Sequence, residues 1–329
     1  MDDSRLPMPA RVTVKVPARL HLGFLDLNGG LGRRFGSIGL AVDGLGTRLT
    51  IKTASHAVIK GPDGARAARH LAVMQRELGI AGGLDLTVEA VVPAHAGLGS
   101  GTQMALAVAA ALRSLRGFPL DPAGDALRLG RGSRSGVGIR LFELGGFIVD
   151  GGRGAAARPA PVVSRMPFPE PWRVLVVLDP ARQGVHGAEE DAAFAQLAAQ
   201  PADRAAHACR LVLMQALPAL AEEDLASFGA AVRELQNLSG DYFAPLQGGA
   251  RFTSPQVATA LDLLHQEGAC GIGQSSWGPT GFAFAPSAEG AERLAEILRD
   301  DQRGKGLDIH VCRGLNRGAE IMIEAAAGA

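Results

Sequence analysis

The sequence predicts a two-domain protein that combines strands with helices, and three observations support this prediction. The chain has 329 residues, whereas a single domain commonly holds about 100–200. Residues 84–92 alternate apolar and polar side chains, which is typical of a half-buried strand. Residues 102–116 are an unbroken run of helix-forming residues, and a glycine-rich loop at 93–102 joins them to the strand.

The composition is that of a globular protein without a marked charge. Hydrophobic residues make up 47% of the chain and the formal net charge is zero, so we expect neither a nucleic acid nor a membrane as partner. The sequence also lacks a secretory signal and the run of about 18 apolar residues that a membrane helix needs. Three widely spaced cysteines predict a reduced, cytoplasmic protein. Arginine outnumbers lysine 29 to 4, so a single arginine is weak evidence for an anion site.

The first half of the chain predicts strands and short helices on either side of the glycine-rich loop. In order they are a strand at 12–16, a loop at 28–39, paired strands at 38–42 and 47–52, a helix at 65–78, the strand, loop and helix described above, a helix at 122–131, a second glycine-rich turn at 130–138 and a buried strand at 147–150.

Five prolines between residues 159 and 171 mark the expected domain boundary, which divides the chain into residues 1–160 and 161–329. The second half predicts a buried strand at 174–178, a mostly helical stretch at 192–238, a helix at 255–267, a glycine-rich polar loop at 271–280, a strand at 281–285, a helix at 289–300 and a closing strand at 319–325.

The first glycine-rich loop has the features of an anion site. Free backbone N–H groups and the positive end of the helix dipole converge at a helix N-terminus, so a phosphate or pyrophosphate is the expected ligand. The alternative is a turn whose glycines only allow a helix to pack closely on a sheet. The loop lacks the Lys-Ser/Thr pair of a P-loop and the glycine spacing of a dinucleotide fingerprint. The phosphate-binding candidates are Gly97, Leu98, Gly99, Ser100, Gly101 and Thr102.

A second group of candidates follows the first strand. Arg19, His21 and Asp26 lie within eight positions, and Arg19 and His21 share a face if the segment is extended. We expect these three residues to line a cleft opposite the phosphate loop. The alternative is a surface ion pair of Arg19 with Asp26, with His21 capping a loop.

The three glycine-rich polar turns, at 93–102, 130–138 and 271–280, together resemble the motifs of the GHMP kinase superfamily along nearly the whole chain. Residues 93–102 are similar to its phosphate-binding motif and residues 17–20 to its N-terminal motif. The resemblance implies an α+β fold with an N-terminal domain like ribosomal protein S5 domain 2 and a ferredoxin-like C-terminal domain. It also implies an active site in the cleft between them.

The sequence departs from the kinases at one position that matters for chemistry. Residues 135–138 followed by Gly145 and Gly146 match the spacing of the Ser-Gly-x-Asp…Gly-Gly segment of the kinases. The position of their catalytic aspartate is occupied by Gly138 in this chain. Glycine can neither accept a proton from a hydroxyl nor orient it. In addition, Arg19 stands where many of these kinases carry lysine. The chain therefore predicts a poor kinase.

Five stretches of the sequence resemble one particular family, β-ribofuranosylaminobenzene 5′-phosphate synthase of methanopterin biosynthesis. They are residues 19–23, 36–40, 134–138, 145–152 and 274–280. The resemblance implies transfer of ribose 5-phosphate from phosphoribosyl pyrophosphate to 4-aminobenzoate or 4-hydroxybenzoate, with loss of CO2 and pyrophosphate. Mg2+ is the expected cofactor, with its ligands undefined, and a second copy of the chain is the one protein partner considered. Arg19, His21, Asp26 and Arg134 are the expected catalytic residues, and Ser135, Gln274, Ser275 and Ser276 the expected substrate-binding residues.

Three alternatives remain at the level of sequence. The chain could be an ATP-dependent small-molecule kinase whose base is Asp150 or Asp26, or a catalytically silent binding protein on the same scaffold. Arg134 could be one more surface arginine in an arginine-rich chain.

Overall fold

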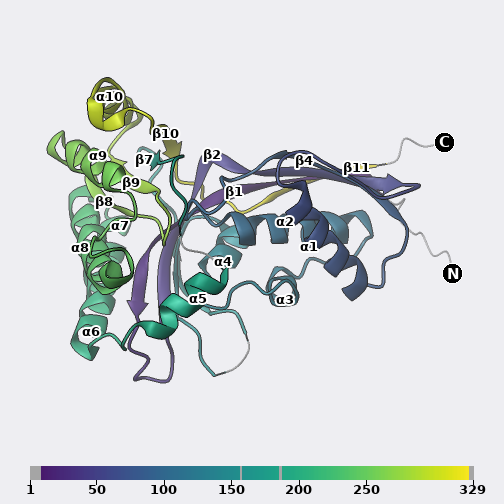
Figure 1. Cartoon of the computed structure of the whole chain (residues 1–329), viewed down its shortest axis with the longest axis horizontal. Helices are drawn as coiled ribbons and strands as arrows, with labels where there is room; N and C mark the ends of the chain where they lie inside the picture. Colours follow the sequence, from purple (N-terminus) through teal and green to yellow (C-terminus); the bar gives the residue numbers. More distant parts are fainter. Residues whose placement is uncertain (1–8, 156–157, 185–186, 326–329) are drawn as a thin grey trace.

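The computed structural model describes residues 9–155, 158–184 and 187–325, which form two sheets covered by helices (Figure 1). The first sheet has seven strands: β1 (Pro9–Asp26), β2 (Phe35–Ala54), β3 (Val58–Lys60), β4 (Gly83–Ala90), β5 (Phe147–Asp150), β6 (Val162–Met166) and β11 (Glu320–Ala325). Its strand order is β11-β1-β2-β4-β3, and β5 pairs with both β2 and β6. Helices α1 (Gly64–Glu77), α2 (Ser100–Leu115), α3 (Pro122–Arg128) and α4 (Val137–Leu144) lie beneath it in Figure 1.

The second sheet has four antiparallel strands in the order β10-β7-β9-β8. They are β7 (Arg173–Leu178), β8 (Cys270–Gln274), β9 (Gly281–Ala285) and β10 (Asp308–Arg313). The remaining helices are α5 (Gly187–Gln196), α6 (Ala202–Leu211), α7 (Leu217–Ala221), α8 (Leu225–Phe243), α9 (Pro255–Gln266) and α10 (Ala288–Asp300). Helix α9 directly precedes β8, α10 precedes β10, and both helices pack on one face of the sheet, which is the arrangement of a ferredoxin-like unit. The predicted α+β class is confirmed.

The long strand β1 contributes to the cores of both halves. Its early apolar residues, such as Val14, pack with Leu71 of α1 and Met104 of α2. Its later apolar residues, such as Leu20, pack with Val174 of β7. The pairing of β1 with β2 shifts register between the two parts, since Pro17 pairs with Gly46 and Ala18 with Val42. The segment that carries Arg19 and His21 therefore lies where the two halves meet.

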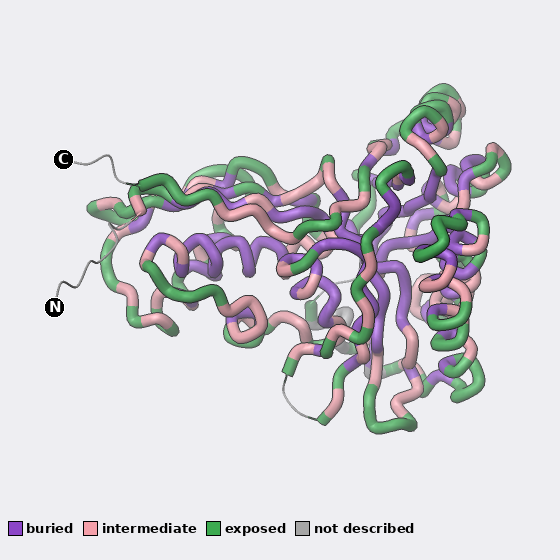
Figure 2. Tube along the Cα trace, turned by 180° about the vertical axis from the view of Figure 1, so that it is seen from behind, coloured by how far each residue is buried: buried purple, intermediate pink, exposed green. Residues whose placement is uncertain are grey.

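Helix α2 is fixed in place by burial on nearly every side. Twelve of its sixteen residues are buried, and five of these twelve are alanine (Figure 2). It contacts β1 and β2 above and α1, α3 and α4 on its other sides. Because alanine adds little bulk and has the best helix propensity, the helix can be surrounded in this way. Its N-terminus, at Ser100, is held rigidly toward the junction of the two sheets.

The predicted pairing of residues 38–42 with 47–52 is wrong. Both segments belong to the single strand β2, and both pair with β1. Gly44, with φ of +73°, and Gly46 lie within the irregular stretch opposite Pro17 rather than in a reverse turn. A Cβ on Gly46 would come within 2.5 Å of the carbonyl oxygen of Val16, so the two strands stay paired through the irregularity only because a glycine is there.

Other elements were displaced or missed at the level of sequence. The predicted loop at 28–39 ends at Phe35, where β2 begins, and the predicted loop at 271–280 contains β8 in its first half. The short strand β3, the strand β10 and the strand β6 in the proline-rich stretch were not predicted. The division at residue 160 stays a prediction, and β6 and β11, which follow it, belong to the first sheet. Within the described ranges no helix is long and apolar enough to cross a membrane.

A buried ion pair ties α2 to α3 and so positions the loop that follows α3. The Nε and Nη2 atoms of Arg113 donate to the two carboxylate oxygens of Asp125 at 2.6 and 2.8 Å. The two side chains are 6% and 2% exposed. Such a pair holds its geometry well, because either charge alone would be costly to bury.

We therefore expect Asp125→Ala to lower the free energy of unfolding by about 3–5 kcal/mol, since it leaves the Arg113 guanidinium buried without its carboxylate. Urea unfolding followed by circular dichroism measures this change. Glu292→Ala is the matched control, because Glu292 pairs with Arg299 on the surface, and such pairs contribute less than about 1 kcal/mol. Equal losses in the two variants would contradict the assignment.

Candidate active site

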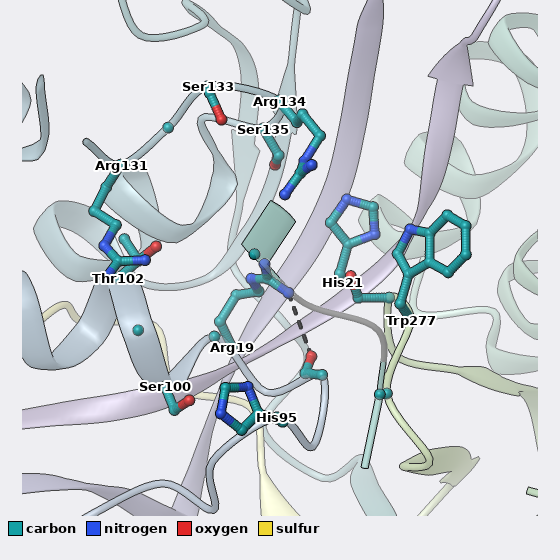
Figure 3. A pocket seen from close by; sticks show the side chains of 18 of the residues that line it. Arg19, His21, His95, Ser100, Thr102, Arg131, Ser133, Arg134, Ser135 and Trp277 are labelled. Carbon is teal, nitrogen blue, oxygen red and sulfur yellow. Dashed lines mark hydrogen bonds between the residues drawn. The ribbon is translucent and has the colours of Figure 1, made fainter. Parts of the chain in front are cut away.

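A cavity of about 540 Å³ opens at the junction of the two halves (Figure 3). Its wall is made by the later part of β1, the first turns of α1, the loop before α2 with the start of that helix, and the segments 130–135 and 276–278. Gly184 and Gly187 complete the described lining. Five segments that lie far apart in the sequence thus converge on one space.

The charge of the cavity is strongly positive. Five arginines line it, together with three histidines: Arg19, Arg66, Arg69, Arg131, Arg134, His21, His70 and His95. No aspartate or glutamate is among the described residues of its wall. Guanidinium groups hold phosphates and carboxylates through paired, charge-assisted hydrogen bonds. The cavity is therefore suited to ligands with several negative charges.

The phosphate-loop residues lie in the cavity wall with one exception. Gly97, Gly99, Ser100, Gly101 and Thr102 line it, and the backbone turns into α2 at Gly99, whose φ is +79°. Leu98 instead is fully buried, and its carbonyl oxygen accepts a hydrogen bond from the backbone N–H of Arg19 at 3.1 Å. The open end of a sixteen-residue helix thus faces the cavity, as an anion site requires.

One glycine of the phosphate loop is needed for close packing rather than for anion binding. A Cβ on Gly97 would lie 2.1 Å from the carbonyl oxygen of Ser275, so Gly97 is needed for the contact between two loops. A Cβ on Gly99 would lie 3.3 Å from the Nε of Arg19, beside the cavity. The two interpretations of the loop therefore apply to different residues.

Arg19 and His21 both line the cavity, from the same face of β1. The Nη1 of Arg19 donates to the carbonyl oxygen of Gly97 at 3.3 Å. The His21 ring is 2% exposed, and its Nε2 has no hydrogen-bond partner among the described residues. Burial, and then the Arg19 cation, hold the pKa of His21 well below its ordinary value, so the imidazole is neutral at pH 7.

Asp26 does not line the cavity, which corrects the expectation that it faces the phosphate loop. It is the last residue of β1, and its carboxylate accepts hydrogen bonds from the backbone N–H groups of Asn28 and Gly29, both at 2.8 Å. A carboxylate at this position caps the turn that leads from β1 toward β2.

Of the three residues expected in the C-terminal loop, Ser276 alone lines the main cavity. Ser275 is fully buried: its Oγ accepts from the backbone N–H of His21 at 3.0 Å and donates to the carbonyl of Gly97 at 2.8 Å. The side chain of Gln274, at the end of β8, accepts from the backbone N–H of Thr253 and donates to the carbonyl of Ser276. These two side chains hold the loop and are turned away from the cavity.

Arg134 and Ser135 line the cavity from its other side. The Arg134 guanidinium lies over the ring of Phe194, 5.1 Å from its centroid. Ser135 Oγ lies 2.6 Å from Ser37 Oγ and 3.3 Å from a carboxylate oxygen of Asp150. Contacts with Ser37 and Asp150 thus hold the segment around Ser135 in place.

Asp150 is the anchor beneath this segment. Its two carboxylate oxygens also accept from the hydroxyl of Ser37 and from the backbone N–H groups of Ser37, Gly136, Val137 and Gly152. Burial raises the pKa of Asp150, and these hydrogen bonds oppose that shift. The residue is fully buried and does not line the cavity, so neither of the substitute bases considered from the sequence faces it.

Gly138 lies in the first turn of α4, close to the cavity wall. A Cβ there would be 3.4 Å from Cγ2 of Thr102 and 3.9 Å from Nε of Arg19. A carboxylate at this position would sit against Arg19 and neutralise it. With glycine, no side chain at position 138 stands between Arg19 and the cavity.

Several cavity residues were missed at the level of sequence: Phe24, Arg66, Arg69, His70, His95, Arg131 and Trp277. The spacing of Arg66, Arg69 and His70 places them on one helix face, which is a usable signal. The general excess of arginine hid it. Phe24 and Trp277 belong to an aromatic cluster with Phe194 and Phe243, and they form an apolar side of an otherwise cationic cavity.

The cavity lacks the ligands that usually hold Mg2+ in a protein. This ion takes oxygen ligands and is usually held by one or two carboxylates together with substrate phosphates. The described wall offers hydroxyls but no carboxylate, and no group of three or more metal-ligating side chains occurs in the described part of the chain. These residues therefore do not form a site of their own for the ion.

Comparison with known proteins shows the superfamily to which the chain belongs. Models of the GHMP kinases match the chain twice, the N-terminal domain over residues 65–141 and the C-terminal domain over residues 216–303. A homoserine kinase from Cytophaga hutchinsonii has the same fold, with a TM-score of 0.66 at 17% identity over 98% of this chain and 100% of that one. A solved complex titled MDDEF with MVAPP, AMPPCP and magnesium, with a TM-score of 0.64 at 16% identity over 95% and 99%, shares it too.

Curated relatives narrow the class. Proteins named β-ribofuranosylphenol 5′-phosphate synthase are 33% identical in Archaeoglobus fulgidus and 32% identical in Methanothermobacter thermautotrophicus. The alignments cover 94% and 95% of this chain and 99% of each relative. The chain belongs to this family within the GHMP kinase superfamily. The resemblance seen in the sequence motifs is thereby confirmed. The relatives' name refers to a phenol, whereas the family name given in the sequence analysis refers to an aminobenzene.

The buried histidines predict a pH dependence of stability. Burial, followed by the cations of Arg131, Arg66 and Arg69, lowers the pKa of His70 from 6.5 to about 4. The His70 imidazole therefore becomes protonated near pH 6.5 in the unfolded chain, whereas in the folded chain it stays neutral until about pH 4. The contribution of His70 is fully present above that pH and is lost as the pH falls toward 4, by at most about 1.4 kcal/mol per pH unit.

We accordingly expect the urea midpoint of the wild type to fall between pH 7 and about pH 4.5, and His70→Gln to show a smaller fall over the same range. His265→Gln is the control, because His265 is partly exposed at the end of α9. Identical pH profiles for the wild type and His70→Gln would contradict the assignment.

Proposed function

We propose that this protein transfers ribose 5-phosphate from phosphoribosyl pyrophosphate to the ring carbon of 4-hydroxybenzoate or 4-aminobenzoate, as a step in tetrahydromethanopterin biosynthesis. The observation that supports this most is a cavity lined by five arginines and, in its described wall, by no carboxylate. Both substrates are anions, and together they carry a phosphate, a diphosphate and a carboxylate. The relatives' name refers to a phenol, which favours the hydroxy acceptor.

The proposed reaction needs no protein base. The C1′–O bond of the donor breaks and pyrophosphate leaves with the electron pair. The ring carbon that bears the carboxylate forms the new C–C bond to C1′. Its bond to the carboxylate then breaks, CO2 departs, and the electron pair returns to the ring. Decarboxylation rather than deprotonation thus restores aromaticity, and glycine at position 138 is compatible with this chemistry.

The residues of the cavity divide naturally between the two substrates. The N–H groups at the start of α2 would hold phosphate oxygens of the donor. Arg19, in the middle of Figure 3, would stabilise charge between the two substrates. The rings of Phe24 and Trp277 would stack against the acceptor, and the neutral His21 imidazole would donate or accept a hydrogen bond to it. Arg134 would hold a phosphate or the acceptor carboxylate.

Magnesium enters this proposal as part of the substrate. Pyrophosphate oxygens are the ligands that Mg2+ prefers, whereas the described wall has no carboxylate to hold it. The ion would therefore arrive and leave with pyrophosphate. The cytoplasm is the proposed compartment, because the three cysteines, at 209, 270 and 312, are unpaired.

The reaction can be separated from its alternatives in one experiment. The protein is incubated with phosphoribosyl pyrophosphate and an acceptor labelled in its carboxyl group, and separately with ATP and candidate alcohols. We expect labelled CO2 in the first reaction and no ADP above background in the second. ADP without CO2 would establish a kinase instead, and neither product would leave a binding protein.

Arg134→Gln tests the cationic wall of the site. If Arg134 contacts bound substrate, removing its charge costs about 1.5–3 kcal/mol, which is at least tenfold in kcat/KM. CO2 release at several substrate concentrations measures it. Arg299→Gln, on the exposed face of α10, serves as the control and should leave kcat/KM unchanged. An unchanged kcat/KM for Arg134→Gln would remove this residue from the site.

A further inference from the structure

One end of the cavity holds three arginines and a neutral histidine that sequence motifs do not explain. Arg66, Arg69 and His70 come from α1, and Arg131 follows α3. We call these four residues the α1 subsite. The Nη1 of Arg66 donates to Oγ of Ser100 at 3.4 Å, and the Arg131 guanidinium lies against Gly101, 3.0 Å from where its Cβ would be. The subsite therefore surrounds the N-terminus of α2.

The charges of the α1 subsite are poorly compensated within the protein. Asp63 pairs with Nε of Arg66 at 3.0 Å, and it does not line the cavity. Neither Arg69 nor Arg131 has an ion pair with a described residue. Arg131 is partly buried, and burial and the neighbouring Arg66 lower its pKa. Gathering like charges away from water is costly unless an anion joins them.

Two buried nitrogen atoms give independent support. The His70 side chain is 93% buried, since its exposed fraction is 7%, and its Nε2 has no hydrogen-bond partner in the described part of the molecule. The Nε of Arg131 is buried and unpartnered in the same sense. Buried polar atoms are normally satisfied, so each such atom beside a cavity indicates a missing ligand or solvent partner.

We propose that the α1 subsite binds the diphosphate of the donor, and so fixes which way the donor lies in the cavity. This inference rests on the proposed function. The three guanidinium groups and the N-terminus of α2 supply the charge that a diphosphate, with about three negative charges at neutral pH, needs for tight binding. A monophosphate would use part of this set only.

The stereochemistry of the transfer agrees with this orientation. In phosphoribosyl pyrophosphate the leaving group is on the α face of C1′, and the relatives' name describes a β-linked product. The acceptor must therefore approach C1′ from the side opposite the diphosphate. In Figure 3, Arg131, Thr102 and Ser100 lie on one side of Arg19, while His21 and Trp277 lie on the other. Diphosphate and acceptor would thus occupy opposite ends, with C1′ near Arg19.

Calorimetric titration with inorganic pyrophosphate tests the subsite directly. It is done in excess Mg2+ at fixed ionic strength, because the ion is proposed to arrive with pyrophosphate, and ribose 5-phosphate is the second probe. We expect Arg66→Gln and Arg131→Gln each to weaken pyrophosphate binding at least tenfold and ribose 5-phosphate binding less than threefold. Arg131→Lys, which keeps the charge, should retain part of the affinity. Arg76→Gln, at the exposed end of the same helix, is the control and should bind both probes like the wild type.

Three results would overturn the inference: no pyrophosphate binding by the wild type, unchanged pyrophosphate binding in both glutamine variants, or an equal loss for both probes. Thermal melting shows whether each variant is folded, and Arg131→Lys keeps the test valid if Arg131→Gln is not.

The carboxyl-label assay separates this inference from the proposed reaction. CO2 release by the wild type, together with unchanged pyrophosphate affinity in the glutamine variants, would leave the reaction standing and remove the subsite. Weakened pyrophosphate affinity in those variants, together with no CO2 release by the wild type, would leave the subsite standing and remove the reaction.

Discussion

The site depends on a place where three loops cross in backbone contact. A Cβ on Gly278 would lie 2.0 Å from the carbonyl oxygen of Ala96, and one on Gly184 would lie 2.3 Å from that of Trp277. The backbone N–H of Gly184 also donates to the carbonyl of His95 at 2.8 Å. Side chains at these glycines would force the loops apart. Because the phosphate loop, the segment after β7 and the loop before β9 meet there, the cavity keeps its shape only while they touch.

The Ser275 hydroxyl locks this crossing to β1. It joins the backbone of His21, on one strand, to the carbonyl of Gly97 in the phosphate loop. The network beneath Ser135 does the same on the other side, where Asp150 collects the N–H groups at the start of α4. In both places polar side chains hold the backbone in position. Arginines and aromatic rings, rather than these polar side chains, face the cavity. An array of like charges can be held in place in this way before any anion arrives.

The sequence predicted the parts of this arrangement that depend on local chemistry. Alternating residues identified β4, and glycines followed by alanines identified the phosphate loop and α2, because these signals lie within a few neighbouring residues. Arg19 and His21 followed from their spacing on one face. Asp26 could not be excluded from sequence, since its use in a turn depends on where β1 ends. Ser275 looked like a ligand-binding hydroxyl, and only the folded contact with Gly97 shows how it is used. Arg66 and Arg69 share a face of α1, but their meeting with Arg131 depends on the packing of α1 and α3 around α2, which no local pattern encodes.

The pairing of β1 with β11 has a consequence for the order in which the chain folds. Val12 lies opposite Ile323, so β1 finds one of its two neighbours only in a strand that is very distant from it in the sequence. Until then that edge of β1 has unpaired backbone groups, and exposed edges of this kind invite pairing with other chains. Contacts this distant in sequence also form slowly. We therefore expect the pairing of β11 with β1 to be a late step of folding, which covers this edge of β1.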